Sequence, residues 1–220
     1  MNLHFLHIGK TGGSAIRYAL KGVNSGSKKI HFYPHNKGLN NIPVGEKIVF
    51  FLRDPFSRFE SGFYSRQRQG RPKYFYKWSK EEEKAFSIFK TPVELVRSAA
   101  DQSCPLNSNA IEALNSIGHV KSHYSDRLVS LDYLTERLDD LFFVGFQETL
   151  SDDFQDLVRR IDIKEAIELP TDDVIAHRSP SYSPMSLTPK EEQFLFHWFA
   201  EDYRFIEYCK QIKKLTLKHS

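Results

Sequence analysis

The stretch LHFLHIGKTGGSAIRYAL, residues 3–20, decides the fold of this chain. Residues 3–8 are short, mostly apolar and bounded by Gly9, which predicts a buried strand. Residues 14–20 place their apolar side chains on one side, which predicts a helix. A glycine-containing turn between a buried strand and a helix can bind an anion, because the first backbone N–H groups of the helix have no partner within it.

Further strands and helices alternate along the chain. Strands are predicted at 29–33, 47–52 and 141–146. Helices are predicted from Pro55 to about Gln69 and from about Leu150, and a final aromatic-rich helix over 189–209. Capping boxes predict three helix starts, at Ser79 with Glu82, Thr91 with Glu94 and Thr188 with Glu191. We therefore expect an α/β fold, a single domain over residues 1–220 with a central, mostly parallel sheet flanked by helices.

Composition narrows the class of protein. A chain of 220 residues with 40% hydrophobic residues can bury a core of its own. No run approaches the ~18 apolar residues that a membrane span needs, and the first residues lack a basic signal-peptide region. We expect a cytoplasmic protein without a membrane partner. Cys104 and Cys209 lie outside any paired pattern and are expected to be free thiols.

Charge is unevenly spread along the chain. The formal net charge is only +3, but residues 53–80 hold eight Lys or Arg and two acidic residues. Residues 131–173 hold four basic and thirteen acidic residues. This pattern indicates a local anion site rather than a broad basic face, so we expect no nucleic-acid partner.

The loop after the first strand carries donors for an anion. Lys10 supplies a charge, Thr11 and Ser14 supply hydroxyls, and Gly12 and Gly13 let the backbone approach a ligand closely. The loop departs from the nucleoside-triphosphate motif G-x-x-x-x-G-K-[ST], because its first glycine would fall at His4. A nucleotide-dependent kinase is therefore an alternative, and a plain strand–helix turn is another.

A second candidate anion site follows the strand at 47–52. Arg53 leaves the end of this strand, and the next helix carries Ser61. Carboxyl ends of parallel strands meet at one edge of a sheet, so we expect Arg53 and Lys10 at the same edge. A local ion pair between Arg53 and Asp54 is the alternative.

The two motifs together resemble a known family. K-T-G-G-S after the first strand and L-R-D-P-x-x-R-F-x-S-G-F at the third are similar to the sulfotransferases that use 3′-phosphoadenosine 5′-phosphosulfate (PAPS), the carbohydrate and heparan sulfate 2-O- and 6-O-types and their bacterial homologues above all. VGFQETLSDDF (144–154) and WFAEDYRFIEYC (198–209) support the resemblance.

The resemblance implies a P-loop-like sulfotransferase fold, PAPS as the donor and no metal. It assigns the 5′-phosphosulfate to the first loop, with Lys10, Thr11, Gly12, Gly13 and Ser14. It assigns the 3′-phosphate to Arg53 and Ser61, and a late closing loop adds Arg178.

An acceptor hydroxyl needs a base, and histidine suits this role near neutral pH. In HFYPHN, His35 follows the end of the second strand, and the 2-O-type relatives carry a catalytic histidine in this region. We therefore predict His35 as the base, with His31 second and a surface-loop histidine as the alternative. Pro34 breaks any regular ligand spacing between the two, which speaks against a metal site.

The acceptor is expected at SRQRQGRPKYFYKW, residues 65–78. Arg66, Arg68 and Arg71 alternate there with aromatic residues, a pattern that suits an anionic sugar, single-stranded nucleic acid or a solvated loop. The sequence thus predicts a sulfotransferase acting on a hydroxyl or amine of a carbohydrate or small molecule. A kinase and a non-enzymatic nucleic-acid-binding domain are the alternatives.

Overall fold

The structure is a computed structural model that describes residues 1–23, 26, 28–175 and 185–217. The chain divides into two compact units, and each is described by itself. The first unit comprises Met1–Asp54, His123–His177 and Glu201–Ser220, and the second comprises Pro55–Ser122 and Arg178–Ala200. The expectation of a single domain stays a prediction.

The first unit is built on a four-stranded sheet. Its strands are β1 (Asn2–Leu6), β2 (Lys29–Phe32), β3 (Lys47–Leu52) and β4 (Leu141–Phe146). They lie in the order β2-β1-β3-β4, and every neighbouring pair is parallel. The nearly continuous apolar run of β3 matches its burial on both faces, as is usual in parallel sheets. The α/β class and the parallel sheet are therefore confirmed.

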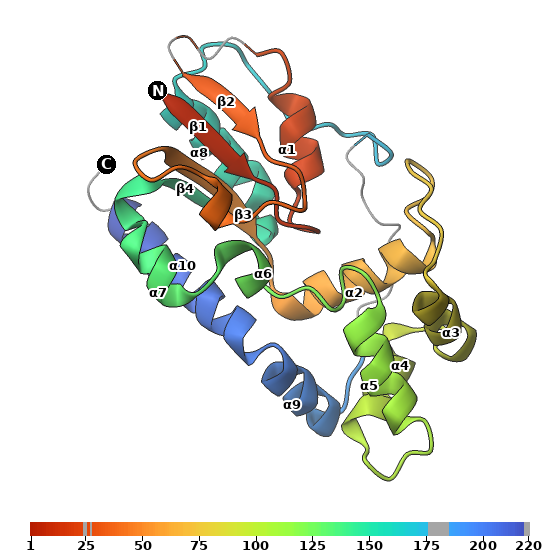
Figure 1. The fold of residues 1–220 in the computed structure, drawn as a ribbon. Coiled ribbons are helices and arrows are strands. Elements are labelled where there is room, and N and C mark those ends of the chain that lie inside the picture. Colours follow the sequence, from red (N-terminus) through yellow and green to blue (C-terminus); the bar gives the residue numbers. More distant parts are fainter. Residues whose placement is uncertain (24–25, 27, 176–184, 218–220) are drawn as a thin grey trace. The chain divides into compact units, whose positions relative to one another are not determined.

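Helices cover both faces of this sheet (Figure 1). One face packs Phe5, Phe51 and Phe154 together under α1 (Gly13–Ala19) and α8 (Leu150–Ile161). The other packs Phe50, Tyr124 and Phe205 under α6 (Ser125–Leu128), α7 (Leu131–Glu136) and α10 (Ala200–Leu217). Short 3₁₀ helices lie at Leu39–Asn41, Leu138–Asp140 and Gln147–Thr149.

The second unit is helical in its described part. Its helices are α2 (Pro55–Gln67), α3 (Lys80–Ile88), α4 (Pro92–Ala100), α5 (Asn107–Ser116) and α9 (Pro189–Trp198). The capping boxes at Ser79, Thr91 and Thr188 form as expected.

The prediction of one helix over 189–209 is wrong. The chain leaves helical geometry at Phe199, between α9 and α10. The Phe199 ring is buried, and its centroid lies 6.1 Å from that of Phe59 on α2. Burial of this ring in the second unit accompanies the break between the two helices.

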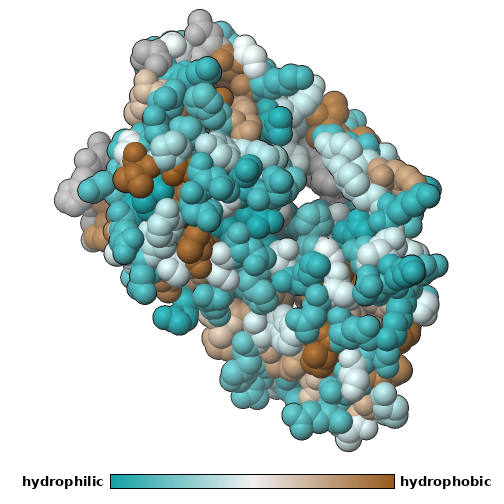
Figure 2. All heavy atoms as spheres, in the orientation of Figure 1, coloured by the Kyte–Doolittle hydropathy of each residue, from teal (hydrophilic) through white to brown (hydrophobic). Residues whose placement is uncertain are grey.

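On the face shown in Figure 2, hydrophilic residues predominate and hydrophobic ones form small, separate patches. Scattered apolar residues of this kind are normal on a protein surface. Among the residues that the structure describes, no helix has the length and apolar character to cross a bilayer. Cys104 and Cys209 are free thiols, as expected, and burial raises the pKa of Cys209 to about 12.

Candidate functional site

The loop between β1 and α1 has a backbone that only some residues tolerate. Gly12 caps α1 with a φ of 87°, and Lys10 also has a positive φ, of 68°. Gly13 has no room for a side chain, because a Cβ there would lie 2.4 Å from the His7 ring. The Thr11 hydroxyl donates to the Ile8 carbonyl at 2.9 Å and is buried, so it braces the loop from inside. The Thr11 hydroxyl proton is therefore already used, and only the backbone N–H of Thr11 remains as a candidate donor to the expected anion.

Lys10 and Arg53 lie together at the carboxyl edge of the sheet. β1 and β3 are neighbouring parallel strands, and each residue follows one of them. The Arg53 guanidinium donates from Nη1 to the Lys10 carbonyl at 3.4 Å. Both side chains are half-buried. The end of β3 therefore holds the loop, and the two cationic residues lie at the same edge of the sheet.

His35 completes this cluster. Its ring centroid lies 3.8 Å from that of His7, which follows β1. The His35 side chain is exposed at the surface, but neighbouring protein atoms remove part of the water around its ring. This desolvation is the largest cause that lowers the pKa of His35 from 6.5. The charges of Arg127, Lys10 and Arg17 lower the pKa further, against a hydrogen bond to the His7 backbone that raises it. A neutral imidazole at pH 7 can accept a proton.

His31 lies elsewhere in the sheet. It pairs with His4 across β1 and β2, and the two rings stack with centroids 5.0 Å apart. Its Nε2 lies 3.3 Å from Asn2 Oδ1. This pairing within the strands, together with the position of His35 beside Lys10, favours His35 over His31 as the base.

Sequence reasoning missed Arg127 and Tyr124, which α6 and its N-cap bring to the same edge. The Tyr124 hydroxyl accepts from the Arg53 backbone N–H at 2.9 Å and donates to the Arg53 carbonyl at 2.5 Å. Arg127 is half-buried, and its Nη1 donates to the Asp126 carbonyl at 2.9 Å. No local motif marks either residue, because α6 has four residues and meets the sheet edge only through tertiary packing.

Ser61 belongs to the second unit, where it is buried on α2. Its neighbour Gly62 packs against His119, which a Cβ at position 62 would approach to 3.1 Å. Arg58, three residues before Ser61, is also buried and donates to the Ser122 carbonyl at 2.7 Å. The assignment of Ser61 to a phosphate stays a prediction. Arg178 lies outside the described residues.

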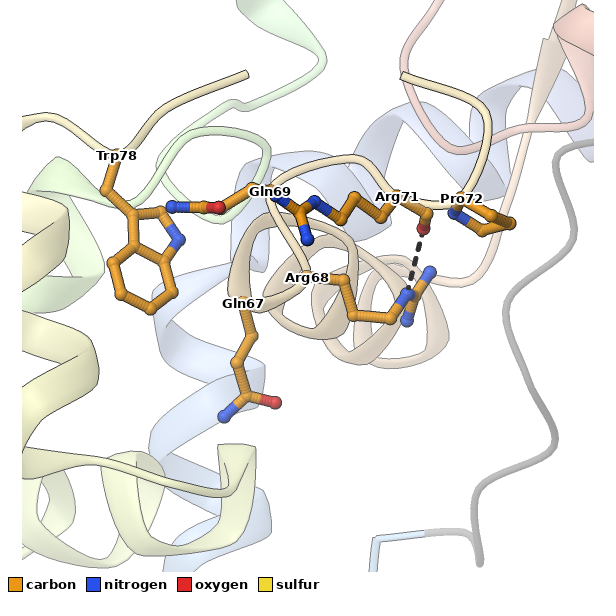
Figure 3. Close-up of a pocket in the computed structure, with 6 residues that line it drawn as sticks. All are labelled: Gln67, Arg68, Gln69, Arg71, Pro72 and Trp78. Carbon is orange, nitrogen blue, oxygen red and sulfur yellow. Dashed lines mark hydrogen bonds between the residues drawn. The ribbon is translucent and has the colours of Figure 1, made fainter. Parts of the chain in front are cut away.

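A pocket of about 480 Å³ lies in the second unit, at the expected acceptor region. Figure 3 shows its lining residues, Gln67, Arg68, Gln69, Arg71, Pro72 and Trp78. Arg68 Nε donates to the Arg71 carbonyl at 3.3 Å, and the Arg71 guanidinium lies 4.7 Å from the Phe75 ring centroid. The pocket is thus lined by an indole, two guanidinium groups and two amides, which can contact a planar or anionic ligand.

Arg66 is held inside the second unit. Its guanidinium binds both carboxylate oxygens of Glu82, at 2.7 and 2.5 Å, and also donates to the carbonyls of Tyr76 and Lys77. Burial raises the pKa of Glu82, but hydrogen bonds from Arg66, Ser79 and Gly118 outweigh it and lower the pKa overall. These bonds give Arg66 a structural role and argue against its predicted contact with the acceptor.

Two further results bear on the site. Among the described residues, no group of three or more His, Cys, Asp or Glu side chains is arranged to hold a metal ion. Comparisons of the chain with protein-family models, with curated proteins and with solved structures found no match. The resemblance to sulfotransferases therefore rests on the motifs quoted above.

Proposed function

We propose that this protein is a sulfotransferase that moves the sulfuryl group of PAPS to a hydroxyl or amine of an acceptor. One observation carries the proposal. Three cationic side chains, Lys10, Arg17 and Arg127, act together on His35 at the carboxyl edge of the sheet. Several cations around one ring suit a multiply charged anion, and an imidazole that burial and these charges keep neutral suits a base.

The proposed chemistry is an in-line displacement at sulfur. The acceptor oxygen forms a bond to sulfur, its proton passes to His35, and the bond from sulfur to the 5′-phosphate oxygen breaks. The leaving 3′-phosphoadenosine 5′-phosphate (PAP) gains negative charge on this oxygen. Lys10 stabilises that charge, and a charged donor aimed at a developing anion is typically the largest single contribution to such catalysis.

Arg53 is proposed to bind the 3′-phosphate. Its guanidinium donates to the Lys10 carbonyl, so a nucleotide bound by the loop would have the Arg53 cation beside it. Ser61 and Arg178 remain predicted partners of the same phosphate on the motif alone.

We place the acceptor contacts at Arg68, Arg71 and Trp78, and leave Arg66 out. The first three line a pocket, whereas Arg66 is bound to Glu82. A carbohydrate or small molecule with an anionic group fits this chemistry.

A kinase is the less favoured reading. The position of the missing upstream glycine is occupied by His4, which is buried within β1 and cannot be part of a phosphate-binding loop.

The test is calorimetric titration with PAP, and with 5′-AMP and ATP–Mg²⁺ as controls. We expect micromolar binding of PAP and much weaker binding of AMP, because only PAP carries the 3′-phosphate. Preference for ATP–Mg²⁺ would indicate a kinase. Indifference to all three, with steeply salt-dependent binding of an oligonucleotide, would indicate a nucleic-acid-binding domain.

A further inference from the structure

A hydrogen-bonded chain of residues links the first turn of α10 to the proposed nucleotide loop. It begins at Asp202, whose side chain is fully buried. One carboxylate oxygen accepts the backbone N–H of Tyr124 at 2.5 Å, and the other lies 2.6 Å from His123 Nδ1. A buried carboxylate that binds two successive residues fixes the backbone at this position.

Tyr124, whose backbone Asp202 holds, in turn holds the residue that follows β3. Its side chain is fully buried, and its hydroxyl bonds both the N–H and the carbonyl of Arg53. One phenol that bonds both backbone groups of one residue holds the peptide planes on either side of its Cα. The guanidinium of Arg53 then starts from a fixed point, and it reaches the Lys10 carbonyl.

The next residue, Asp54, is held from the same helix. Asp54 accepts a hydrogen bond at 3.2 Å from the hydroxyl of Tyr203, the neighbour of Asp202 on α10. The Asp54 backbone N–H donates to Glu148 at 2.7 Å. Three polar side chains from three parts of the sequence, Tyr124, Glu148 and Tyr203, therefore converge on Arg53 and Asp54. These bonds fix the backbone from which the Arg53 side chain starts.

We propose that Tyr124, supported by Asp202, is a positioning residue that directs Arg53 toward the 3′-phosphate and so sets selectivity for a 3′,5′-bisphosphate nucleotide. This inference rests on the proposed function. Tyr124 touches neither nucleotide nor reacting atoms and acts through Arg53. An arginine that must order itself on binding loses affinity, because freezing its side chain costs free energy.

The test compares Tyr124→Phe with wild type and with Tyr133→Phe as the matched control. Tyr133 packs against the same core, but its hydroxyl contacts Arg137, which binds carbonyls that precede β3. Calorimetry gives the dissociation constants of PAP and 5′-AMP for each variant. We expect Tyr124→Phe to weaken PAP by about tenfold, or about 1.4 kcal/mol. AMP, which lacks the 3′-phosphate, should change by less than about twofold, and Tyr133→Phe should change neither.

Asp202→Asn is the second variant, and it acts from the other end of the chain of bonds. Its amide oxygen can still accept from Tyr124, so a smaller fall in the ratio of PAP to AMP affinity is expected. An equal loss of both ligands in either folded variant, or no loss, would overturn the inference while leaving the proposed function standing. Wild-type protein that binds PAP no better than AMP would overturn the proposed function, and this inference with it.

Discussion

The arginines of the two units show how the same residue type is used in opposite ways. In the second unit, Arg66 faces a carboxylate and two carbonyls, and Glu82 neutralises its charge. In the first unit, the contact described for Arg127 is to a backbone carbonyl, which takes a hydrogen bond but leaves the positive charge in place. The charge of Arg127 then reaches His35 and lowers its pKa. Closely spaced arginines in a sequence therefore predict an anion site only where no carboxylate of the folded protein pairs with them.

The largest expected effect is at the cationic cluster of the first unit. His35→Ala should lower turnover by about 10²- to 10⁴-fold, because the acceptor proton loses its base. PAP affinity by calorimetry should stay nearly unchanged. Loss of PAP binding would make His35 a ligand and would remove it from the role of base.

The next effect tests the internal arginine of the second unit. Arg66→Ala should lower the free energy of unfolding by about 3–5 kcal/mol, because it leaves Glu82 buried without its cation. Denaturant unfolding measures this loss. Arg68→Ala is the control, expected within about 0.5 kcal/mol, and it should instead raise the KM for an anionic acceptor. Equal stability of the two variants would break the contrast between Arg66 and the pocket arginines.

The smallest expected effect comes from removing Arg127, the first-unit arginine of the comparison. Arg127→Ala should weaken PAP by about five- to tenfold. It should also raise the pKa of His35 toward 6.5, because its charge is the largest cause of the lowering after burial. An NMR titration of the imidazole in the variant and in wild type measures this change.

The acid limb of the pH–rate profile gives a second measurement. Since a lowered pKa keeps His35 neutral, wild-type activity should be lost only below pH 6.5, and the limb should move to higher pH in Arg127→Ala. An unchanged pKa would contradict the electrostatic coupling.

Local signals in the sequence predicted the sheet and several helix starts. Apolar runs such as 47–52 are typical of buried strands at that length, and a capping box satisfies backbone groups within four residues. α5 lacks a side-chain cap, so no capping box in the sequence predicted where it begins.

The site was predictable only where its residues follow strand ends. Lys10, Arg53 and His35 could be placed at one edge because parallel strands end together. The remaining residues of this edge lie on α6, at its N-cap and on α10, namely Arg127, Tyr124 and Asp202. The position of these helices depends on packing across the whole unit. Arg66 could not be told from Arg68 and Arg71, because Glu82 meets it only after the intervening loop has folded back.

The contact between Gly13 and His7 has a consequence for engineering this protein. The His7 ring fills the space that a side chain at position 13 would need, and it lies against His35. Any larger residue at position 13 must displace this ring and disturb the imidazole behind it. A mutant library of this loop should therefore keep position 13 constant, or vary it only together with position 7.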